Sequence, residues 1–545
     1  MTIKSGTSTR VQACLANARC PRVNWPDATP ADAGLCFGIL RRGKEHLKNQ
    51  VQLVTYVDRL SGGGLKKLRA LLNGSLGGTF GGVHLLPFFH PIDGADAGFD
   101  PIDHTEVDSR LGNWNDVLAL TEDFELMADL IVNHISSESP QFKDFSRQGD
   151  SSPFAGMFLT YDRVFPLGAS ESDLLRIFRP RPELPFTSVV LESGDKRLLW
   201  TTFTPRQIDI DVRHPQGEAY LEAILGRFQA AGVRMIRLDA VGYAIKEPGT
   251  SCFMIPETFR FVTKLAARAH ALGMEVLVEV HGHHSQQVEI ARKVDWVYDF
   301  ALPPLVLHSL FTGDTRSLVQ WLAIRPHNSI TVLDTHDGIG VIDVGAGGQG
   351  EPGLLAPAEI EHLVETIHSR SQGESRQATG AAANNLDHDQ VNCTFYDALG
   401  GRGNEYLIAR AVQFFVPGVP QVYYVGLLAG TNDMELLART QVGRDINRHY
   451  YTSAEVKNDL AEPRGPTSAR SYPPPKYSSR FCGTSSGGVS VQSHPHDHVD
   501  TECSFGEARR GFRRTRSLDY VLHARRHPAA SCRNSGIISH QDWQH

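Results

Sequence analysis

Short, continuous apolar runs recur along the middle of the chain, as in strands that are buried on both faces of a parallel sheet. Eight runs have this character: VQLVTYV from Val51, GVHLLPFF from Gly82, LMADLIVN from Leu126, VRMIRLD from Val233, EVLVEVH from Glu275, VDWVYDF from Val294, ITVLDT from Ile330 and VPQVYYV from Val419. Amphipathic segments lie between them. Residues 217–232 and 257–273, for example, space their apolar side chains as a helix does and end on glycine.

This alternation predicts an α/β fold with eight strands and intervening helices, a (β/α)8 TIM barrel. A doubly wound open sheet is the competing architecture, but no G-x-G-x-x-G sequence follows the first strand. Two long segments interrupt the alternation, one after the third strand and one after the seventh. Inserts at these places help to build the active-site face of a barrel, because they follow the C-terminal ends of strands.

The two ends of the chain lack the alternating pattern. Residues 1–46 show no clear periodicity, and residues 464–545 are rich in Ser, Arg, His and Pro but poor in aliphatic side chains. Such segments cannot easily offset the entropy lost on ordering, so we expect disorder at both ends. The predicted organisation is an N-terminal extension (1–46), three parts of a barrel (47–134, 213–338 and 401–463), two insertions (135–212 and 339–400) and an aberrant or disordered tail (464–545).

Composition is that of a globular protein and narrows the function. The 545 residues are 41% hydrophobic and 21% charged, with a formal net charge of -7. An acidic chain is a poor general binder of nucleic acid or of an anionic membrane, and no apolar run is long enough to cross a bilayer. The N-terminus lacks the apolar core of a signal peptide, and Cys252 and Cys393 form no C-x-x-C pattern. We therefore expect a cytoplasmic protein without disulfides.

Polar residues gather where several of the predicted strands end. They are Asp129 to His134 at the end of the third run, Arg237 and Asp239 in the fourth, Glu279 and His281 in the fifth, and Asp334, His336 and Asp337 at the end of the seventh. One such Asp by itself is more often a helix cap or an ion-pair partner. Four polar ends in register favour an active site, because barrel enzymes carry their catalytic groups at this end of the strands.

Three convergent carboxylates, without a catalytic cysteine pattern or an H-E-x-x-H sequence, indicate glycosidic chemistry and not zinc hydrolysis. One carboxylate can attack the anomeric carbon while a protonated partner donates to the leaving oxygen. In a retaining enzyme these two groups stand roughly 5 to 5.5 Å apart. We expect burial to raise the pKa of the acid and Arg237 to keep Asp239 ionised as the nucleophile.

Four segments, DLIVNH, GVRMIRLDA, EVLVEVH and VLDTHD, resemble in this order the alpha-amylase superfamily, glycoside hydrolase family 13. Closer similarity to its sucrose phosphorylase subfamily comes from FDPIDHTEVD, RPRPELPF, FTPRQIDID, RLDAVGYAIKEPGTSCFM, TVLDTHDGIGVID and GRDINRHYY. The resemblance covers about residues 47–463. It implies a barrel with an inserted domain B, and a small C-terminal β-domain that is missing or replaced here after Pro463.

The resemblance also implies a role for each site residue. Asp239 would be the nucleophile, Glu279 the general acid/base and Asp337 the carboxylate that stabilises the transition state. The other residues would bind substrate: Asp96 and Arg444 as a pair at the closed end, Phe99 and Phe203 as an apolar wall, His134, Arg237, Tyr243, His281 and His336 around the sugar, and Arg181, Gln207, Asp387 and Gln390 on the acceptor side.

The implied reaction converts sucrose and phosphate into α-D-glucose 1-phosphate and D-fructose by double displacement. Neither a cofactor nor a metal is expected, because carboxylates carry the chemistry and phosphate is a co-substrate. The resemblance also suggests a homodimer. His388 and Asp389 depart from the subfamily pattern near the acceptor, which leaves alternatives open. These are phosphorylases of sucrose 6'-phosphate, glucosylglycerol or glucosylglycerate, and a sucrose hydrolase or transglucosylase.

A non-enzyme interpretation also stands beside this one. Leu47 lies where subfamily members begin, and the similarity stops after Pro463. The two ends would then come from an upstream start and a shifted reading frame, and the product could be truncated and inactive. Sequencing of the native N-terminus and of the gene tests these two hypotheses. An intact Met1 or a confirmed frame would contradict them.

Overall fold

Eight parallel strands close into a barrel in the computed structural model, which describes residues 50–461 apart from 95, 181–183, 349 and 381–389. Around the barrel the order is β1-β16-β13-β12-β11-β10-β5-β2. The bounds are β1 (Gln52–Thr55), β2 (Gly82–Leu85), β5 (Glu125–Ile131), β10 (Met235–Asp239), β11 (Glu275–Val278), β12 (Trp296–Asp299), β13 (Ser329–Thr331) and β16 (Val419–Tyr423). Each strand overlaps one of the predicted apolar runs, so the predicted (β/α)8 barrel is confirmed.

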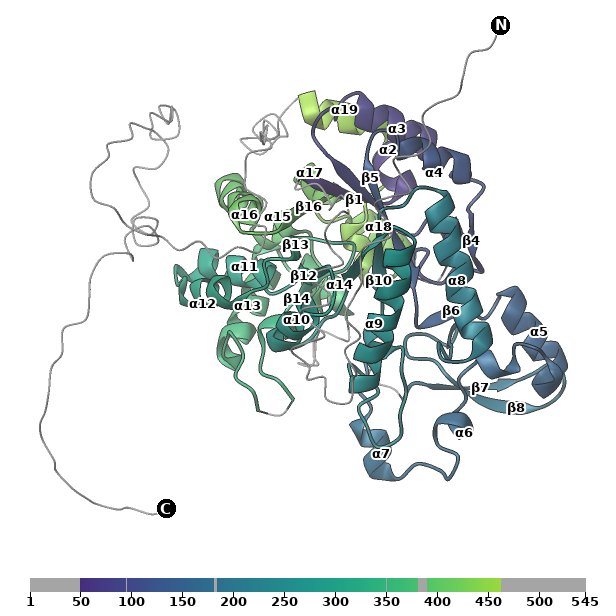
Figure 1. Ribbon diagram of the computed structural model, residues 1–545. Helices are drawn as coiled ribbons and strands as arrows, with labels where there is room; N and C mark the ends of the chain where they lie inside the picture. The colour runs from purple at the N-terminus through teal and green to yellow at the C-terminus, as the bar shows by residue number, and fades with distance from the viewer. Residues whose placement is uncertain (1–49, 95, 181–183, 349, 381–389, 462–545) are drawn as a thin grey trace, which may run out of the picture. The chain divides into compact units, whose positions relative to one another are not determined.

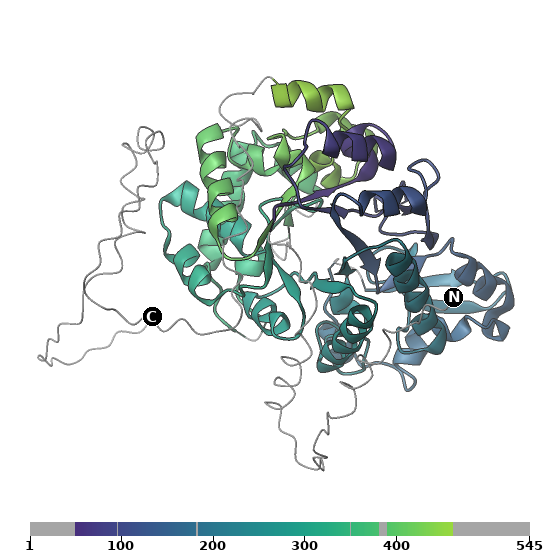
Figure 2. The ribbon, with the colours of Figure 1, turned by 45° about the horizontal axis from the view of Figure 1, so that its top comes forward.

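Helices surround the strands (Figures 1 and 2). They are α2 (Val57–Ser61), α3 (Leu65–Asn73), α4 (Trp114–Leu120), α8 (Pro215–Ala230), α9 (Pro256–Ala271), α10 (His284–Ala291), α11 (Leu302–Thr312), α12 (Arg316–Ile324), α16 (Gly403–Phe415), α17 (Tyr424–Leu427), α18 (Met434–Thr440) and α19 (Ser453–Ala461). The two predicted helices are α8 and α9. Each has proline in its first turn, and each is followed by a glycine with positive φ, Gly232 at 75° and Gly273 at 82°.

The core lies between these helices and the strands. Ile224 and Phe228 of α8 belong to the same buried cluster as Ile236 of β10 and Val276 of β11, and all four are 0% exposed. Burial of such side chains from water stabilises the barrel by roughly 1.5 to 3 kcal/mol each. The barrel strands, and with them the polar residues at their ends, are therefore held in fixed positions.

The first insertion leaves the barrel after β5 and returns through a short antiparallel pair. β6 (His134–Ser136) pairs with β9 (Gln207–Asp209), which sets His134 opposite Asp209. Between them lie α5 (Pro140–Gln148), η1 (Gly149–Ser151), η2 (Ala155–Met157), α6 (Tyr161–Val164), α7 (Glu171–Arg176) and a hairpin of β7 (Phe186–Val190) and β8 (Lys196–Trp200). A small apolar cluster contains Phe165, Ile177 and Trp200 of this insertion together with Cys252, which follows β10. This cluster and the strand pair fix the return of the chain to the site.

The second insertion follows β13 and also closes with a short pair. β14 (Ile339–Gly340) pairs antiparallel with β15 (Gln390–Val391), so that Gly340 lies opposite Gln390. The other elements of this segment are η4 (Ile342–Val344), α13 (Pro357–Arg370), α14 (Glu374–Thr379) and α15 (Phe395–Ala398). Four further short elements lie near the site: the pair of β3 (Phe89–His90) and β4 (Asp103–Val107), η3 (Val241–Tyr243), and η6 (Gly443–Asn447).

Several predictions fall outside the described residues. These are the extension 1–46, the tail 464–545 with the replaced β-domain, Arg181 and Asp387. The boundaries of the predicted segments stay predictions. Within the part of the chain that the structure describes, Cys252 and Cys393 are free and buried, and no helix is long and apolar enough to span a membrane.

Candidate active site

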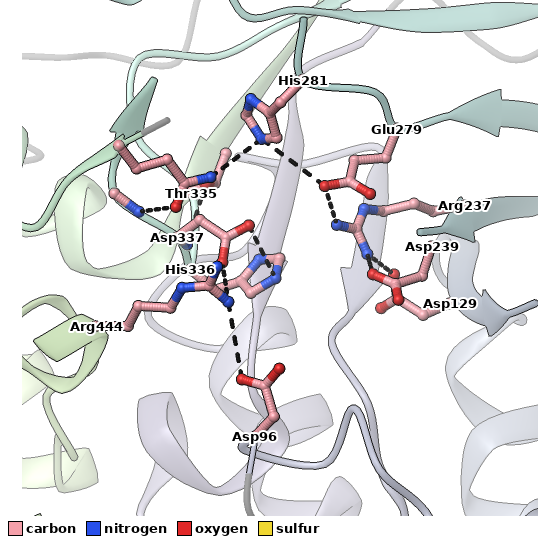
Figure 3. Close-up of polar contacts among 12 residues, drawn as sticks. Asp96, Asp129, Arg237, Asp239, Glu279, His281, Thr335, His336, Asp337 and Arg444 are labelled. Carbon is pink, nitrogen blue, oxygen red and sulfur yellow. Dashed lines mark hydrogen bonds and ion pairs between the residues drawn. The ribbon is translucent and has the colours of Figure 1, made fainter. Parts of the chain in front are cut away.

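Arg237 lies among three carboxylates at the C-terminal end of the barrel strands (Figure 3). β10 pairs in register with β5, which sets Arg237 opposite Asp129. Arg237 Nη1 donates to Asp129 Oδ1 at 2.5 Å and to Asp239 Oδ1 at 2.9 Å. Arg237 Nη2 lies 3.4 Å from Glu279 Oε1, directly after β11. One guanidinium therefore holds the predicted nucleophile and the predicted acid close together. The site is buried, so water screens the interactions between these charges only weakly.

The carboxylates around Arg237 differ in their affinity for a proton. Burial raises the pKa of Asp129, but His84 and Arg237 outweigh burial and lower this pKa to about 2. Burial also raises the pKa of Asp239 well above its usual range; Arg237 lowers it, and Glu279 and Asp129 raise it further. The predicted effect of Arg237 is present, but burial and the neighbouring carboxylates outweigh it in the pKa of Asp239. The physical reason is that Arg237 Nη1 also neutralises Asp129, to which it is closer.

Asp239 thus belongs to a group of carboxylates that titrates together in a dry site. Of the two predicted catalytic carboxylates, the one nearer to a cation is the better stabilised in its charged form. Arg237 lies 2.9 Å from Asp239 and 3.4 Å from Glu279, so its positive charge is closer to the predicted nucleophile than to the predicted acid. Glu279 Oε2 also accepts the backbone N–H of Ala240 at 3.2 Å, which fixes its orientation. One ionised and one protonated carboxyl group is the state that a retaining glycosidase uses.

Asp337 forms the opposite side of the site with Arg444 (Figure 3). Arg444 Nη1 lies 2.9 Å from Asp337 Oδ1 and 3.8 Å from Asp96 Oδ1, so the predicted pair with Asp96 is present but is the longer contact. Burial raises the pKa of Asp337, yet Arg444, His336 and Arg448 lower it well below its usual range. Burial lowers the pKa of His336 to about 3. Asp337 is therefore an ionised carboxylate, next to a neutral histidine.

Aromatic rings line the site between these two charged groups. Phe99 stacks on His336 with ring centroids 4.9 Å apart and an interplanar angle of 10°. Phe203 meets His134 and Tyr243 edge-on, with a centroid distance of 5.3 Å to each. His134 Nε2 lies 2.9 Å from the backbone oxygen of Phe99, which joins the two groups of rings. A sugar ring could pack its apolar face against such a surface.

A group of polar side chains lies beside Glu279. His281 Nε2 is 3.8 Å from Glu279 Oε1 and 3.3 Å from Gln390 Nε2. The buried Gln207 places its Nε2 3.1 Å from His134 Nε2. His281 follows β11, Gln390 lies in β15 and Gln207 lies in β9, so both insertions contribute polar side chains to the site.

The structure brings all the described predicted residues into one connected group. The contacts given above join Asp96, Phe99, His134, Phe203, Gln207, Arg237, Asp239, Tyr243, Glu279, His281, His336, Asp337, Gln390 and Arg444. The contact of Arg237 with Phe99 connects the carboxylates around Arg237 to the aromatic residues, with the guanidinium carbon 5.6 Å from the centre of the Phe99 ring. Arg181 and Asp387 are outside the described residues.

Three residues that touch the site were given no role in it by the sequence. Asp129 shares Arg237, Arg448 donates through Nε to the backbone oxygen of His336 at 2.9 Å, and Asp343 Oδ2 lies 3.1 Å from His281 Nδ1. Asp129 could have been found, because a charge inside an apolar run needs a partner. Asp343, in η4, ends the TVLDTHDGIGVID segment that carries the resemblance, but the segment by itself gives it no role.

Among the described residues, Glu279, His281 and Asp337 form a group that could hold a metal ion. Their donor atoms lie within 4.8 Å of one another. However, Arg237 is 3.4 Å from Glu279 and Arg444 is 2.9 Å from Asp337, and both cations would oppose a further positive charge. A metal ion at this place would therefore have to compete with the two guanidinium groups.

Comparisons with known proteins agree with this geometry. A scan against protein-family models gives no match. Sucrose phosphorylase of Agrobacterium vitis is 66% identical over 417 residues, which cover 76% of this chain and 86% of that protein. Sucrose phosphorylase of Bifidobacterium adolescentis is 55% identical over 419 residues, covering 76% and 83%.

A solved structure is similar over the same part of the chain. Sucrose 6F-phosphate phosphorylase from Thermoanaerobacter thermosaccharolyticum matches with a TM-score of 0.70 and 37% identity, covering 77% of this chain and 86% of that chain. Identity at these levels over most of the relatives' length is shared by members of one family. The chain therefore belongs to the sucrose phosphorylase family, within glycoside hydrolase family 13.

Proposed function

We propose that the protein transfers glucose from sucrose to phosphate and forms α-D-glucose 1-phosphate and D-fructose. The observation that carries the proposal is the single guanidinium of Arg237, which contacts both Asp239 and Glu279. This contact supports a nucleophile and an acid of opposite protonation state side by side. The high identity to sucrose phosphorylases supports the choice of substrate.

In the first step, the carboxylate of Asp239 attacks the anomeric carbon of the glucosyl unit. The bond from that carbon to the fructosyl oxygen breaks, and Glu279 gives its proton to this oxygen as fructose leaves. A covalent glucosyl ester on Asp239 results. Burial of the site favours this step, because the Asp239 carboxylate does not have to lose a shell of bound water before it attacks.

In the second step, a phosphate oxygen attacks the same carbon from the side that fructose has left. The ester bond to Asp239 breaks, and Glu279 takes the proton that the attacking oxygen carries. Two inversions retain the α configuration. Asp337, ionised next to Arg444, would bind sugar hydroxyls and stabilise the positive charge that develops on the ring.

The remaining roles follow from position. Asp96 and Arg444 would close the site behind the glucose, and Phe99 and Phe203 would pack against the sugar ring. Gln207, His281 and Gln390 would meet the acceptor. Carboxylates supply the nucleophile and the acid in this mechanism, so we propose that phosphate is a co-substrate and that no further cofactor takes part.

The assay is fructose release from sucrose by the full chain, with and without phosphate. The proposal predicts release that depends on phosphate and an equal amount of glucose 1-phosphate. Release of free glucose and fructose at the same rate without phosphate would instead indicate a hydrolase. Folded protein that releases neither product would contradict an enzymatic role.

A second candidate is a phosphorylase of sucrose 6'-phosphate. The solved structure of a sucrose 6F-phosphate phosphorylase, 37% identical to this chain, is the observation that favours it. Parallel assays with sucrose and sucrose 6'-phosphate separate the two, and glucosylglycerol and glucosylglycerate complete the panel of donors. A cytoplasmic location and a homodimer stay predictions, which cell fractionation and light scattering can test.

A further inference from the structure

Asp343 is a fully buried carboxylate, 0% exposed, that the proposed mechanism does not use. Its Oδ2 accepts from His281 Nδ1 at 3.1 Å. Its Oδ1 accepts from Gln287 Nε2 at 2.9 Å and from the backbone N–H of Gly282 at 3.3 Å. Asp343 lies in η4 of the second insertion, while all three partners follow β11. The carboxylate therefore ties the insertion to the segment that carries His281.

The contact with Asp343 decides which nitrogen of His281 faces the catalytic carboxylates. A carboxylate accepts and does not donate, so Nδ1 carries a hydrogen and points away from the site. Nε2 then points toward Glu279 Oε1, 3.8 Å away (Figure 3). Phe300 stacks on the imidazole at a centroid distance of 4.0 Å and an interplanar angle of 15°, which holds the ring plane.

The charges that face His281 favour a proton on both nitrogens. Burial lowers the pKa of His281, but Asp343, Glu279 and Asp337 outweigh burial and raise this pKa to about 9. The amide of Gln390 acts in the other direction. Its oxygen accepts the N–H of Gly338 at 3.2 Å, so its own N–H group faces Nε2, at 3.3 Å. This single long contact with a neutral amide affects the protonation of His281 less than the three carboxylates do.

Gly340 leaves room for the contact between Asp343 and His281. A Cβ atom on Gly340 would lie 2.6 Å from Asp343 Oδ2 and 3.4 Å from His281 Nδ1. Gly340 belongs to β14, which pairs with β15 and thereby also places Gln390. The same two short strands thus position Gln390 and pass close enough to the carboxylate–imidazole contact to exclude any side chain.

We propose that Asp343 is a positioning residue of this active site: it orients His281 so that Nε2–H meets an anionic acceptor beside Glu279. The inference rests on the proposed function, because the anionic acceptor is the phosphate of that reaction. Asp343 itself touches neither the sugar nor the phosphate. Its contribution is to fix the tautomer and the positive charge of His281, as a buried carboxylate does for histidines at other catalytic sites.

The test compares phosphate with water as acceptor in the Asp343→Asn variant. The amide oxygen can still accept from Gly282 and Gln287, but the amide nitrogen now donates to Nδ1 and reverses the tautomer of His281. We expect the ratio of glucose 1-phosphate formation to sucrose hydrolysis to fall by about tenfold or more, since a hydrogen bond to a charged group is lost. The rate of hydrolysis should change less, because the acceptor in that reaction is a neutral water molecule. The ratio does not depend on how much of the sample is folded.

The pH profile gives a second readout that a purely structural role would not move. In the unmodified chain, use of phosphate relative to water should decline as pH rises through about 9, where His281 loses its second proton. In Asp343→Asn the same decline should occur at lower pH, because the carboxylate that stabilises the imidazolium has gone.

Two further variants make the comparison decisive. Gly340→Ala presses a methyl group against Asp343 Oδ2 and should lower the same ratio. Gln287→Met removes a hydrogen bond to Asp343 but keeps the carboxylate, so it should lower stability and leave the ratio unchanged. Equal ratios in Asp343→Asn, Gly340→Ala and the unmodified chain would overturn this inference alone. An unmodified chain that forms no glucose 1-phosphate would overturn the proposed function and this inference with it.

Discussion

Arg237 and the carboxylates around it carry the charges on which the proposed chemistry depends. The sequence predicts Arg237, Asp239 and Glu279 as strand-end residues of one site, and their contacts agree with that prediction. The sequence does not reveal that Asp129 uses the same guanidinium, at 2.5 Å. The raised pKa of Asp239 could therefore not be predicted, since it depends in part on a contact between residues 108 positions apart.

Replacement of the proposed nucleophile tests this site at the scale of one residue. We expect Asp239→Asn to lower the rate of glucose 1-phosphate formation by at least about a thousandfold, because an amide cannot form the ester. Asp162→Asn, on the exposed surface of α6, is the matched control and should keep full activity. Comparable activity in both variants would show that Asp239 is not the nucleophile.

The ion pair of Asp129 should make the free energy of unfolding depend on pH. The pKa of Asp129 is lowered to about 2, against roughly 3.9 in an unfolded chain, so the contribution of the ion pair is complete above about pH 4 and is lost as pH falls through about 2. Asp129→Asn breaks a buried ion pair and should lower the free energy of unfolding by about 3 to 5 kcal/mol at neutral pH. Denaturant titrations should show this difference shrinking as the pH is lowered from 5 toward 3. A difference that stays constant would contradict the assigned pKa.

At the scale of elements, the parallel strands are predictable and the short antiparallel ones are not. All eight barrel strands come from apolar runs that need burial on both faces. β6, β9, β14 and β15 are two or three residues long and have no periodicity of their own. β13 also ends at Thr331, although its apolar run continues, because residues 332–337 leave the sheet and carry Asp337 to the site. Positions set by such tertiary pairing, as for Gln207 and Gln390, cannot be derived from local pattern.

The link between the first insertion and the barrel gives a prediction at this scale. Lys246, just after η3, lies 2.6 Å from Asp209 Oδ2 of β9 and 2.6 Å from Asn133 Oδ1, and both ends of the ion pair are buried. Lys246→Ala should lower the free energy of unfolding by about 3 to 5 kcal/mol, because Asp209 is left charged and unpaired.

A double-mutant cycle isolates that ion pair. Asp209→Asn should cost less stability in a Lys246→Met background than in the unmodified chain, since the partner charge is already absent. Chemical denaturation of the four chains measures this coupling. Additive effects would mean that the pair does not hold the insertion in place.

At the scale of the whole molecule, the barrel brings together residues from Asp96 to Arg444. The convergence of the strand-end residues was predicted because the C-terminal ends of parallel barrel strands share one face, whereas the places of Asp96 and Arg444 were implied by the family resemblance. The resemblance to glycoside hydrolase family 13, carried by short motifs, assigned roles that spacing alone could not. The rest of the site depends on side-chain geometry. The acceptor side is the least predictable part, because it is built from the two insertions.

The most direct test of retaining glucosyl transfer to phosphate is nuclear magnetic resonance of the reaction mixture. Sucrose and phosphate are incubated with the full chain, and the anomeric configuration and amount of glucose 1-phosphate are followed with time. The proposed double displacement predicts the α-anomer as the first product, in equal amount with fructose. Formation of the β-anomer, or of fructose without glucose 1-phosphate, would contradict it.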